Sequence, residues 1–528
     1  MKMPSNSQHS FARVPQANIQ RSQFRSPYTN KFDFSAGYLV PFMVDEVLPG
    51  DTFNDKFSMF GRLATPIKPI LDNLYLDTFF FFVPNRLLWD NWERFNGAQD
   101  NPDDPTDFLV PQCPAPAVSG FAYNSLQDYM GIPPAITGFS HNSFHTRAYN
   151  LIWNDFFRDQ NLQDSVVVDK DDGPDDPADY VLLRRGKRHD YFTSCLPFPQ
   201  KGPAASLAFA GNAPVTGVGT TSLVNNPIAN VYETGTVGTQ TYAHGRTSAN
   251  GMVFETDAGG VPSIYADLSA VSAFTINEFR QAFQLQMLLE MDARGGTRYV
   301  EIIKAHYNVV SPDFRLQRPE YLGGSSTPIT ITQVAQQGAT ATIWDTPQGN
   351  LAAYGTVTNT RDGYVKSFVE HGVIIALLSV RADLTYQQGL RRMWSRRTRY
   401  DFYWPALANL GEMAVLNKEI YLKGSAAPAW DDMVFGYQEA WADYRYHPSL
   451  ICGQLRSDAP QSLDIWHVSQ DLVDPVLGDE FIEDKPPIDR ISAVTDPIEP
   501  NMIIDIFGQL TRARPMPLFS TPGLITRL

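Results

Sequence analysis

The sequence predicts a mainly β protein, either a sandwich or a barrel. Short runs of aromatic and β-branched residues are separated by turn residues such as Pro49-Gly50-Asp51, and helical patterns do not alternate with them as in a doubly wound fold. The chain has 528 residues, of which 43% are hydrophobic and 12% aromatic, so it can bury a large core and is not a disordered protein. Its longest apolar run, 372–380, is about half the roughly 20 residues that a bilayer span needs. The first 16 residues contain no secretory signal.

Strands are predicted where apolar runs are bounded by turn residues. Residues 74–83 (LYLDTFFFFV) are such a run, which Pro84 ends, as expected of a buried strand. The other strand candidates are residues 180–185, 299–309, 328–335, 364–386 and 419–422.

Two helices are predicted, and both are expected to pack on a sheet. Thr275 and Glu278 fit a capping box, and Gly295-Gly296 ends the helix that follows. Its apolar residues recur at spacings of three and four: Phe279, Phe283, Met287, Leu288 and Met291. The second helix runs from a cap at Ser143 to about Arg158, with an apolar face of Ala148, Ile152 and Phe156.

The chain divides into five predicted segments. These are a basic extended arm (1–30), the first part of the β body (31–202), a surface insertion (203–268), the second part of the body (269–505) and a basic tail (506–528). Within the insertion, residues 203–250 are rich in Gly and Thr and contain only Glu233 and Arg246 as charges. We expect short hairpins there, with a disordered linker as the alternative. Long insertions of this kind usually serve an interaction.

The net charge is −15, but basic and acidic residues are segregated along the chain. Residues 1–32 contain five basic residues and no acid, residues 391–399 contain five arginines and no acid, and three arginines follow Asp505. Residues 458–505 instead contain twelve acids and only Lys485 and Arg490. This distribution indicates a protein whose two sides meet different partners.

Known catalytic and metal-binding patterns are missing from the sequence. It contains no phosphate-binding loop, dinucleotide fingerprint or nucleophile elbow. His141 and His145 have the spacing of a zinc-protease pair, but Asn142 stands in place of the essential glutamate, so structural histidines are expected. The aspartates of 100–107 and 169–179 could bind calcium, yet prolines interrupt both runs, and we expect solvated loops. The three cysteines are far apart, which predicts buried thiols in a reducing compartment and no disulfide or zinc site. We therefore predict no cofactor.

Residues 390–405 (LRRMWSRRTRYDFYWP) combine arginines with aromatic residues. Guanidinium groups bind phosphate through two parallel hydrogen bonds, and aromatic rings stack on unpaired bases, so this segment suits single-stranded nucleic acid. The candidate nucleic-acid-binding residues are Arg391, Arg392, Trp394, Arg396, Arg397 and Arg399, followed by Arg13, Arg21 and Arg25 of the arm. Alternatively, the arginines of 391–399 pair with the acids of 458–505 in the same or a neighbouring chain. A second basic cluster, 184–189, is expected to pair with the aspartates of 169–179.

Several long stretches resemble the major capsid proteins of microviruses, specifically the gokushovirus branch. They are residues 76–97 (LDTFFFFVPNRLLWDNWERFNG) and 435–457 (FGYQEAWADYRYHPSLICGQLRS), and residues 14–53 and 507–524 are similar as well. The resemblance covers most of the chain and is weakest in the Gly/Thr-rich insertion.

The resemblance implies an eight-stranded antiparallel jelly roll with large inserted loops. It further implies a non-enzymatic subunit of a T = 1 icosahedral shell, assembled in the bacterial cytoplasm around a circular single-stranded DNA genome. The implied partners are copies of the chain, the DNA, a small basic DNA-binding protein, an internal scaffolding protein, a minor pilot-type protein and a host receptor. Residues 203–268 are the candidate for a protrusion at the three-fold axes. The alternative function is that of a carbohydrate-active sandwich enzyme or a lectin-like adhesin, because exposed tryptophans and aspartate-rich loops suit sugars.

Overall fold

The computed structural model describes residues 20–202, 212–214, 229–231, 240–242, 265–267, 276–315, 317–338, 349–493 and 500–519. The chain forms two compact units, of which one is Gln200–Arg294 and the other is Met1–Pro199 together with Gly295–Leu528. The predicted insertion 203–268 falls within the smaller unit. None of the helices in the described ranges is both long and apolar enough to cross a membrane.

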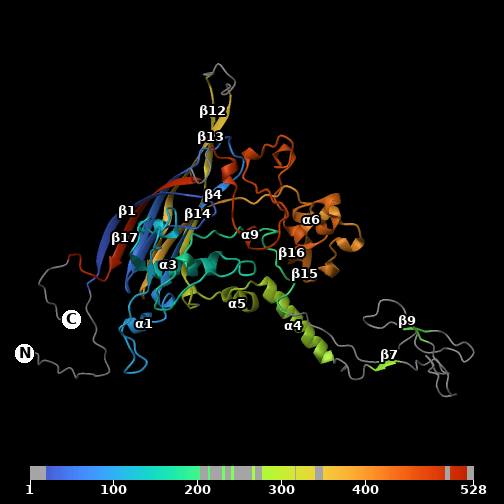
Figure 1. The fold of residues 1–528 in the computed structure, drawn as a ribbon, viewed down its shortest axis with the longest axis horizontal. Helices are drawn as coiled ribbons and strands as arrows, with labels where there is room; N and C mark the ends of the chain where they lie inside the picture. Colours follow the sequence, from blue (N-terminus) through green and yellow to red (C-terminus); the bar gives the residue numbers. More distant parts are fainter. Residues whose placement is uncertain are drawn as a thin grey trace, which may run out of the picture. The chain divides into compact units, whose positions relative to one another are not determined.

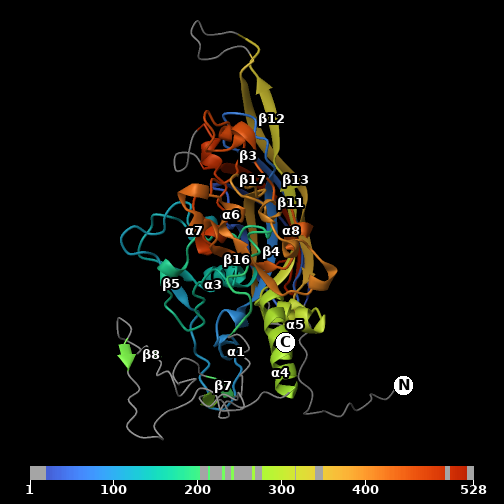
Figure 2. The same cartoon turned by 90° about the vertical axis from the view of Figure 1, so that its right-hand side faces the viewer.

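The larger unit is built on two antiparallel sheets (Figures 1 and 2). The first has the order β1 (Ser22–Phe34), β17 (Met502–Arg514), β3 (Thr52–Leu63), β13 (Leu351–Ser367) and β12 (Thr330–Ala335). The second has the order β11 (Glu320–Pro328), β4 (Leu74–Pro84), β14 (Gly372–Ala382) and β2 (Val40–Val47). This arrangement confirms the predicted antiparallel β-sandwich. The two sheets contain five and four strands, one more than the eight that were predicted in all. The edge strand β12, which follows β11 in the chain and pairs with β13, belongs to the larger sheet.

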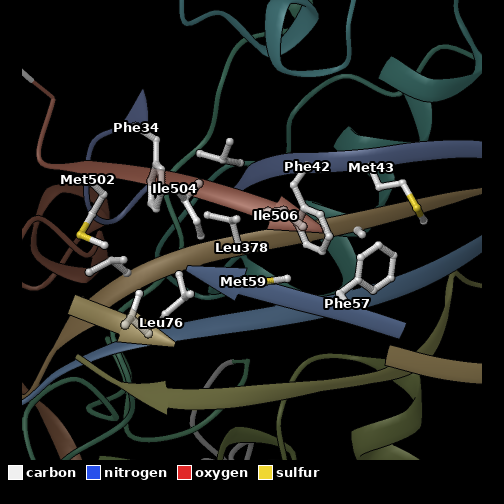
Figure 3. Packing of buried hydrophobic residues seen from close by; sticks show 14 of the residues in the cluster. Phe34, Phe42, Met43, Phe57, Met59, Leu76, Leu378, Met502, Ile504 and Ile506 are labelled. Carbon is white, nitrogen blue, oxygen red and sulfur yellow. The ribbon is translucent and has the colours of Figure 1, made fainter. Parts of the chain in front are cut away.

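The main core lies between the two sheets, as Figure 3 shows. On the first sheet, β3 alternates buried and exposed residues, so that Phe57 and Met59 point inward. Ile504 and Ile506 of β17 do the same from the neighbouring strand. This two-residue period is what a sheet with one buried face requires.

Strand β14 is buried along almost its whole length because both of its faces are covered. Ile374 and Leu378 point into the main core, whereas Ile375 and Leu377 point into a second core on the outer face of the sheet. A central strand covered on both faces has a continuous apolar sequence.

The second core contains the predicted helix near Ser143. It is observed as α3 (Phe144–Ile152), which continues as one π turn over Trp153–Phe157. Ala148 and Ile152 are buried against the second sheet, as expected. The side chain of Ser143 does not cap the helix; Asn142 Oδ1 accepts the Phe144 backbone N–H instead, at 2.9 Å.

The predicted helix in the smaller unit is observed as α4 (Ile276–Arg294), while Thr275 of the expected capping box lies outside the described residues. Its apolar residues are exposed, Phe283 by 58%. In the insertion, β8 (Ala229–Val231) pairs with β9 (Gln240–Tyr242) and β10 (Tyr265–Asp267) with β7 (Asn212–Pro214), both antiparallel. The rest of the expected hairpin segment is outside the described residues.

Of the strand predictions, 74–83 and 328–335 are confirmed as β4 and β12, and 364–386 contains the end of β13 and all of β14. Three are wrong. Residues 180–185 form no strand beyond an isolated bridge at Arg184, and 419–422 fall on α6 (Asn417–Ile420) and the extended residues after it. Residues 299–309 begin with α5 (Tyr299–Tyr307), because the Glu301 carboxylate accepts the backbone N–H groups of Thr297 and Arg298, each at 3.1 Å. These bonds satisfy the free amides of a helix start.

The other elements of the larger unit are short. They are α1 (Trp92–Phe95), β5 (Gln112–Pro114), α2 (Leu126–Tyr129), β6 (Ser140–Asn142), β15 (Glu412–Leu416), α7 (Pro428–Asp431), β16 (Val434–Glu439), α8 (Ala442–Arg445) and α9 (Asp479–Ile482), with several single 3-10 turns. Strands β15 and β16 pair with each other and support a third apolar cluster.

Two of the bulges in the main sheets each place a glycine at positive φ. The register of β13 against β3 shifts after Asn359, and Gly363 follows with φ of 144°. The register of β11 against β4 shifts before Gly323, whose φ is 141°. A Cβ on Gly363 would lie 2.1 Å from the backbone oxygen of Asp55, whereas one on Gly323 would have no neighbour within 4 Å.

Candidate nucleic-acid interface

The arginine-rich segment 390–405 consists of short turns beside the β15–β16 pair. Single 3-10 turns cover Arg392–Ser395 and Arg399–Asp401. The Asp401 carboxylate accepts the backbone N–H of Arg397 at 2.8 Å and that of Thr398 at 2.6 Å. These hydrogen bonds lower the pKa of Asp401, which keeps the carboxylate charged and the turn closed.

Arg392 is held within the protein. Its Nη2 lies 2.8 Å from Oε1 of the buried Glu419, and it also contacts the carbonyl of Ala414. Burial alone would lower the pKa of Arg392, but the Glu419 charge outweighs it and raises the pKa above its usual value. The guanidinium is therefore a permanent partner for a buried carboxylate.

Arg396 is also engaged inside the chain. Its Nη2 contacts the Asp443 carboxylate, its Nε donates to the Asp401 carbonyl at 2.9 Å, and its guanidinium lies 4.1 Å from the centre of the Tyr444 ring. Neither Glu419 nor Asp443 belongs to the acidic region 458–505 that the alternative reading proposed as the partner. No sequence pattern pointed to these two acids, which are 27 and 47 residues from their arginines.

Three of the candidate residues in the segment are exposed. Trp394 is 69% exposed, and Arg397 and Arg399 are exposed beside it. Arg399 lies 4.5 Å from the centre of the Trp404 ring, whose Nε1 donates to the Arg399 carbonyl at 3.1 Å. Within the described part of the chain, no carboxylate lies at ion-pair distance from Arg397.

Arg391 is half-buried at the rim of a small cavity of about 40 Å³. Tyr191, Tyr386 and Tyr446 line this cavity together with the Arg392–Glu419 pair. Asp443 and His447 line it as well, so the cavity combines aromatic walls with charged and polar groups next to the cationic segment.

The arm arginines lie on or next to a different element, strand β1. Arg21 is exposed, and its Nη2 donates to Thr52 Oγ1 at 2.9 Å. Arg25 is exposed on β1, opposite Thr511 of β17, and Arg13 lies outside the described residues. No hydrogen bond or ion pair among the described residues connects Arg21 or Arg25 to the 391–399 segment.

The second basic cluster, 184–189, does not pair with the aspartates of 169–179, contrary to expectation. Arg185 instead pairs with Asp77 of β4 at 2.7 Å, and Arg381 of β14 reaches the same carboxylate at 2.9 Å. Lys187 donates to the Phe481 carbonyl at 2.6 Å. The cluster thus fastens the sheet to the surrounding loops.

The aspartate-rich loop 169–179 binds protein donors. Asp175 forms a fully buried pair with Arg147, and Asp172 accepts the indole N–H of Trp89 at 2.7 Å. No group of three or more His, Cys, Asp or Glu in the described ranges is arranged to hold a metal ion. His145 is also structural, since burial lowers its pKa to about 4 and keeps the ring neutral.

The prediction of buried thiols is correct for two of the three cysteines and wrong for Cys452. Cys113 and Cys195 are buried free thiols, and Cys452 is an exposed free thiol. Burial raises the pKa of Cys113 to about 12, which keeps this thiol protonated and unreactive.

Comparison with known proteins agrees with the fold. The family described as "Capsid protein (F protein)" matches residues 12–524. "Capsid protein VP1" of Bdellovibrio phage phiMH2K is 47% identical over the full length of both chains. The proteins of the same name from Chlamydia phage 1 and Spiroplasma virus 4 are 42% and 37% identical, over 99% and 98% of this chain and 99% and 97% of theirs. The chain therefore belongs to the capsid protein (F protein) family of microviruses, whose members are structural proteins of the virion rather than enzymes.

Proposed function

We propose that this major capsid protein builds a T = 1 icosahedral shell around a circular single-stranded DNA genome, and that the segment 391–399 contacts the DNA. The observation that supports the contact is the exposure of Trp394, Arg397 and Arg399 on a segment that Glu419 and Asp443 hold in place. A segment that is held in place and exposes cationic side chains and an aromatic ring is suited to binding flexible single-stranded DNA.

The residues of the segment have different proposed roles in DNA binding. Arg391, Arg397 and Arg399 neutralise phosphates, and Trp394 stacks on an unpaired base. Arg392 and Arg396 contribute to the same interface through positioning, because their charges are already paired with carboxylates. Arg13, Arg21 and Arg25 of the arm supply further phosphate contacts. None of these groups reads base identity, so binding is independent of sequence.

The test measures binding of a fluorescent oligothymidine to dissociated subunits at several salt concentrations. Each phosphate contact on single strands contributes about 0.7 to the slope of log affinity against log salt. The double variant Arg397→Ala/Arg399→Ala is expected to reduce that slope by about 1.4, because two phosphate contacts are lost. Trp394→Ala is expected to lower affinity by at least about fivefold with the slope unchanged, because stacking on a base does not depend on counterions.

The matched control is Arg94→Ala, which removes an exposed arginine of α1 that faces Asp100 at 3.4 Å. It is expected to leave both the affinity and the slope unchanged. Equal slopes for the wild type and the Arg397/Arg399 double variant would show that the segment does not touch DNA.

We also propose which other proteins take part in assembly and in contact with the host. It includes assembly in the bacterial cytoplasm with an internal scaffolding protein, a small basic DNA-binding protein and a minor pilot-type protein. Residues 203–268 are proposed as the three-fold protrusion that meets the host receptor; the support is their low charge and their place in a separate unit. Deleting this segment is expected to leave particle yield intact and abolish adsorption to host cells, and particles that still adsorb would contradict the receptor role.

A further inference from the structure

One β-ribbon extends beyond the sandwich (Figures 1 and 2). Strand β13 pairs with β3 only from Thr356 to Ser367, and β3 ends at Leu63. The first residues of β13, from Leu351, pair with β12 alone. Beyond the end of β3, the first sheet therefore continues as two strands.

Neither edge of this ribbon pairs with a further strand of the described chain. β12 is the last strand of its sheet, and the first residues of β13 have no partner strand on the side away from β12 within the described chain. Unpaired backbone N–H and C=O groups on an edge are a template for another strand. Proteins that remain single protect such edges with charged residues, with proline or with a covering segment.

Within the ribbon, β12 and the first residues of β13 contain no charged residue, although Lys68, from the segment after β3, donates to Asn350 Oδ1 beside the start of β13 at 2.8 Å. Between Thr327 and Thr360 the sequence contains a single charged residue, Asp345. One face of the ribbon consists of Thr330, Thr332, Val334, Ala352 and Tyr354. Val334 is 47% exposed and Tyr354 41%. The opposite face is covered within the chain, since Ala353 is 3% exposed and Ile331 packs against the main core. The exposed face and the unpaired edges are therefore the parts of the ribbon that another surface could cover.

We propose that this ribbon is an interface between copies of the chain, in which β12 of one subunit pairs with the first residues of β13 of the next. A capsid protein assembles with copies of itself, and each copy here carries a net charge of −15. An uncharged surface can join two such copies without bringing like charges together. A nucleic acid or a basic protein would instead select a charged surface.

The directions of the two strands fit this arrangement. β12 and β13 are antiparallel, so β12 of one copy can lie antiparallel to β13 of a neighbour that is related to it by rotation. Repeating the rotation closes a ring in which both edges of every ribbon are paired. A head-to-tail contact of this kind leaves no edge exposed, as in a closed barrel.

The first test places one charge on the ribbon. Val334→Glu is expected to lower the yield of assembled particles by about tenfold or more, because a carboxylate buried in an uncharged contact has no partner. Val365→Glu is the matched control: it makes the same change on β13 at a residue that is 70% exposed, within the part of the strand that β3 supports. It is expected to assemble like the wild type, as is the neutral variant Val334→Thr.

Folding is checked by circular dichroism and urea unfolding of the dissociated subunits, so that a misfolded variant is recognised.

The second test needs no variant: amide hydrogen exchange of residues 330–335 is compared in dissociated subunits and in empty shells of this chain alone. Exchange at least about tenfold slower in the shell is expected, because ladder hydrogen bonds protect amides. Equal exchange in both states, protection that arises only in particles containing other proteins or DNA, or normal assembly of folded Val334→Glu would each overturn the proposal.

Discussion

The carboxyl of Asp484 is buried among cationic side chains of the basic cluster and of β14. Burial raises the pKa of Asp484 to about 6, although Arg185, Lys187, Arg381 and Arg184 act in the opposite direction. The folded protein thus binds this proton more tightly than the unfolded chain, in which an aspartate has a pKa of about 3.9. A raised carboxyl pKa means that the free energy of unfolding falls as the pH rises from about 4 to about 6.

Asp484→Asn is therefore expected to gain stability relative to the wild type by on the order of 2 to 3 kcal/mol between pH 4 and pH 7, because the variant has no proton to lose. The informative quantity is how the difference in unfolding free energy between the variant and the wild type changes with pH. The absolute difference is not informative, because the amide also alters contacts at every pH. Urea unfolding of dissociated subunits across this range measures it. A difference that stays flat with pH would contradict a buried carboxyl that ionises near pH 6.

The arginines of 391–399 show how far residue-level prediction reaches. Their type and spacing predicted affinity for phosphate, but no local pattern distinguished the roles of the five similar side chains. In the structure, Arg392 and Arg396 are paired with Glu419 and Asp443, while Arg397 is exposed. These pairings depend on how the chain folds over tens of residues, and local patterns do not encode that.

At the scale of elements, strands with apolar residues on both faces were the easiest to predict. The segment of β4 was recognised because it is a long apolar run ended by Pro84. The start of 299–309 was misread because Tyr299, Val300 and Ile302 favour strands, whereas the Glu301 side chain stabilises a helix start. Local hydrogen bonding to the backbone decides such segments over intrinsic propensity.

Alanine substitutions at the two bulge glycines, Gly363 and Gly323, distinguish the cost of a steric clash from the cost of backbone strain. Gly363→Ala is expected to destabilise by about 3 kcal/mol or more, because its Cβ overlaps the backbone of β3 in addition to adopting positive φ. Gly323 has nearly the same φ but open space around its Cα, so Gly323→Ala is expected to cost only the backbone strain of about 1 to 3 kcal/mol. Chemical denaturation of both variants measures the difference. Equal losses of unfolding free energy in the two variants would show that β3 moves away from the added Cβ of residue 363 at no energetic cost.

At the scale of the whole molecule, the strand pattern predicted a sandwich or a barrel, and the resemblance supplied the antiparallel sandwich and the capsid family. The enzyme or adhesin alternative is set aside by the relatives, all of which are capsid proteins. The neighbours of each strand could not be predicted from composition or periodicity. β1 and β17, for example, pair across nearly the whole length of the chain.

The net charge of −15 predicts opposite salt effects on assembly and on DNA binding. Raising ionic strength from about 0.1 M to 1 M shortens the screening length from about 10 Å to about 3 Å. The concentration needed for empty-shell assembly is expected to fall by about tenfold as repulsion between subunits weakens. Affinity for oligothymidine is expected to fall over the same range, because salt competes for phosphate. Light scattering and fluorescence anisotropy follow the two processes, and an assembly threshold that rises with salt would show that ion pairs dominate the contacts.

The position of β17 sets the order in which the subunit can mature during synthesis. This strand lies between β1 and β3 and pairs with both, yet it is translated after all the other strands of the sandwich. Until the ribosome has passed residue 514, the larger sheet lacks an inner strand and β1 has nothing to join. At about 5 to 20 residues per second, the N-terminal strand waits for roughly half a minute or more. A nascent chain therefore cannot present a finished sandwich to other subunits, so shell growth draws only on chains whose translation has reached the last strand.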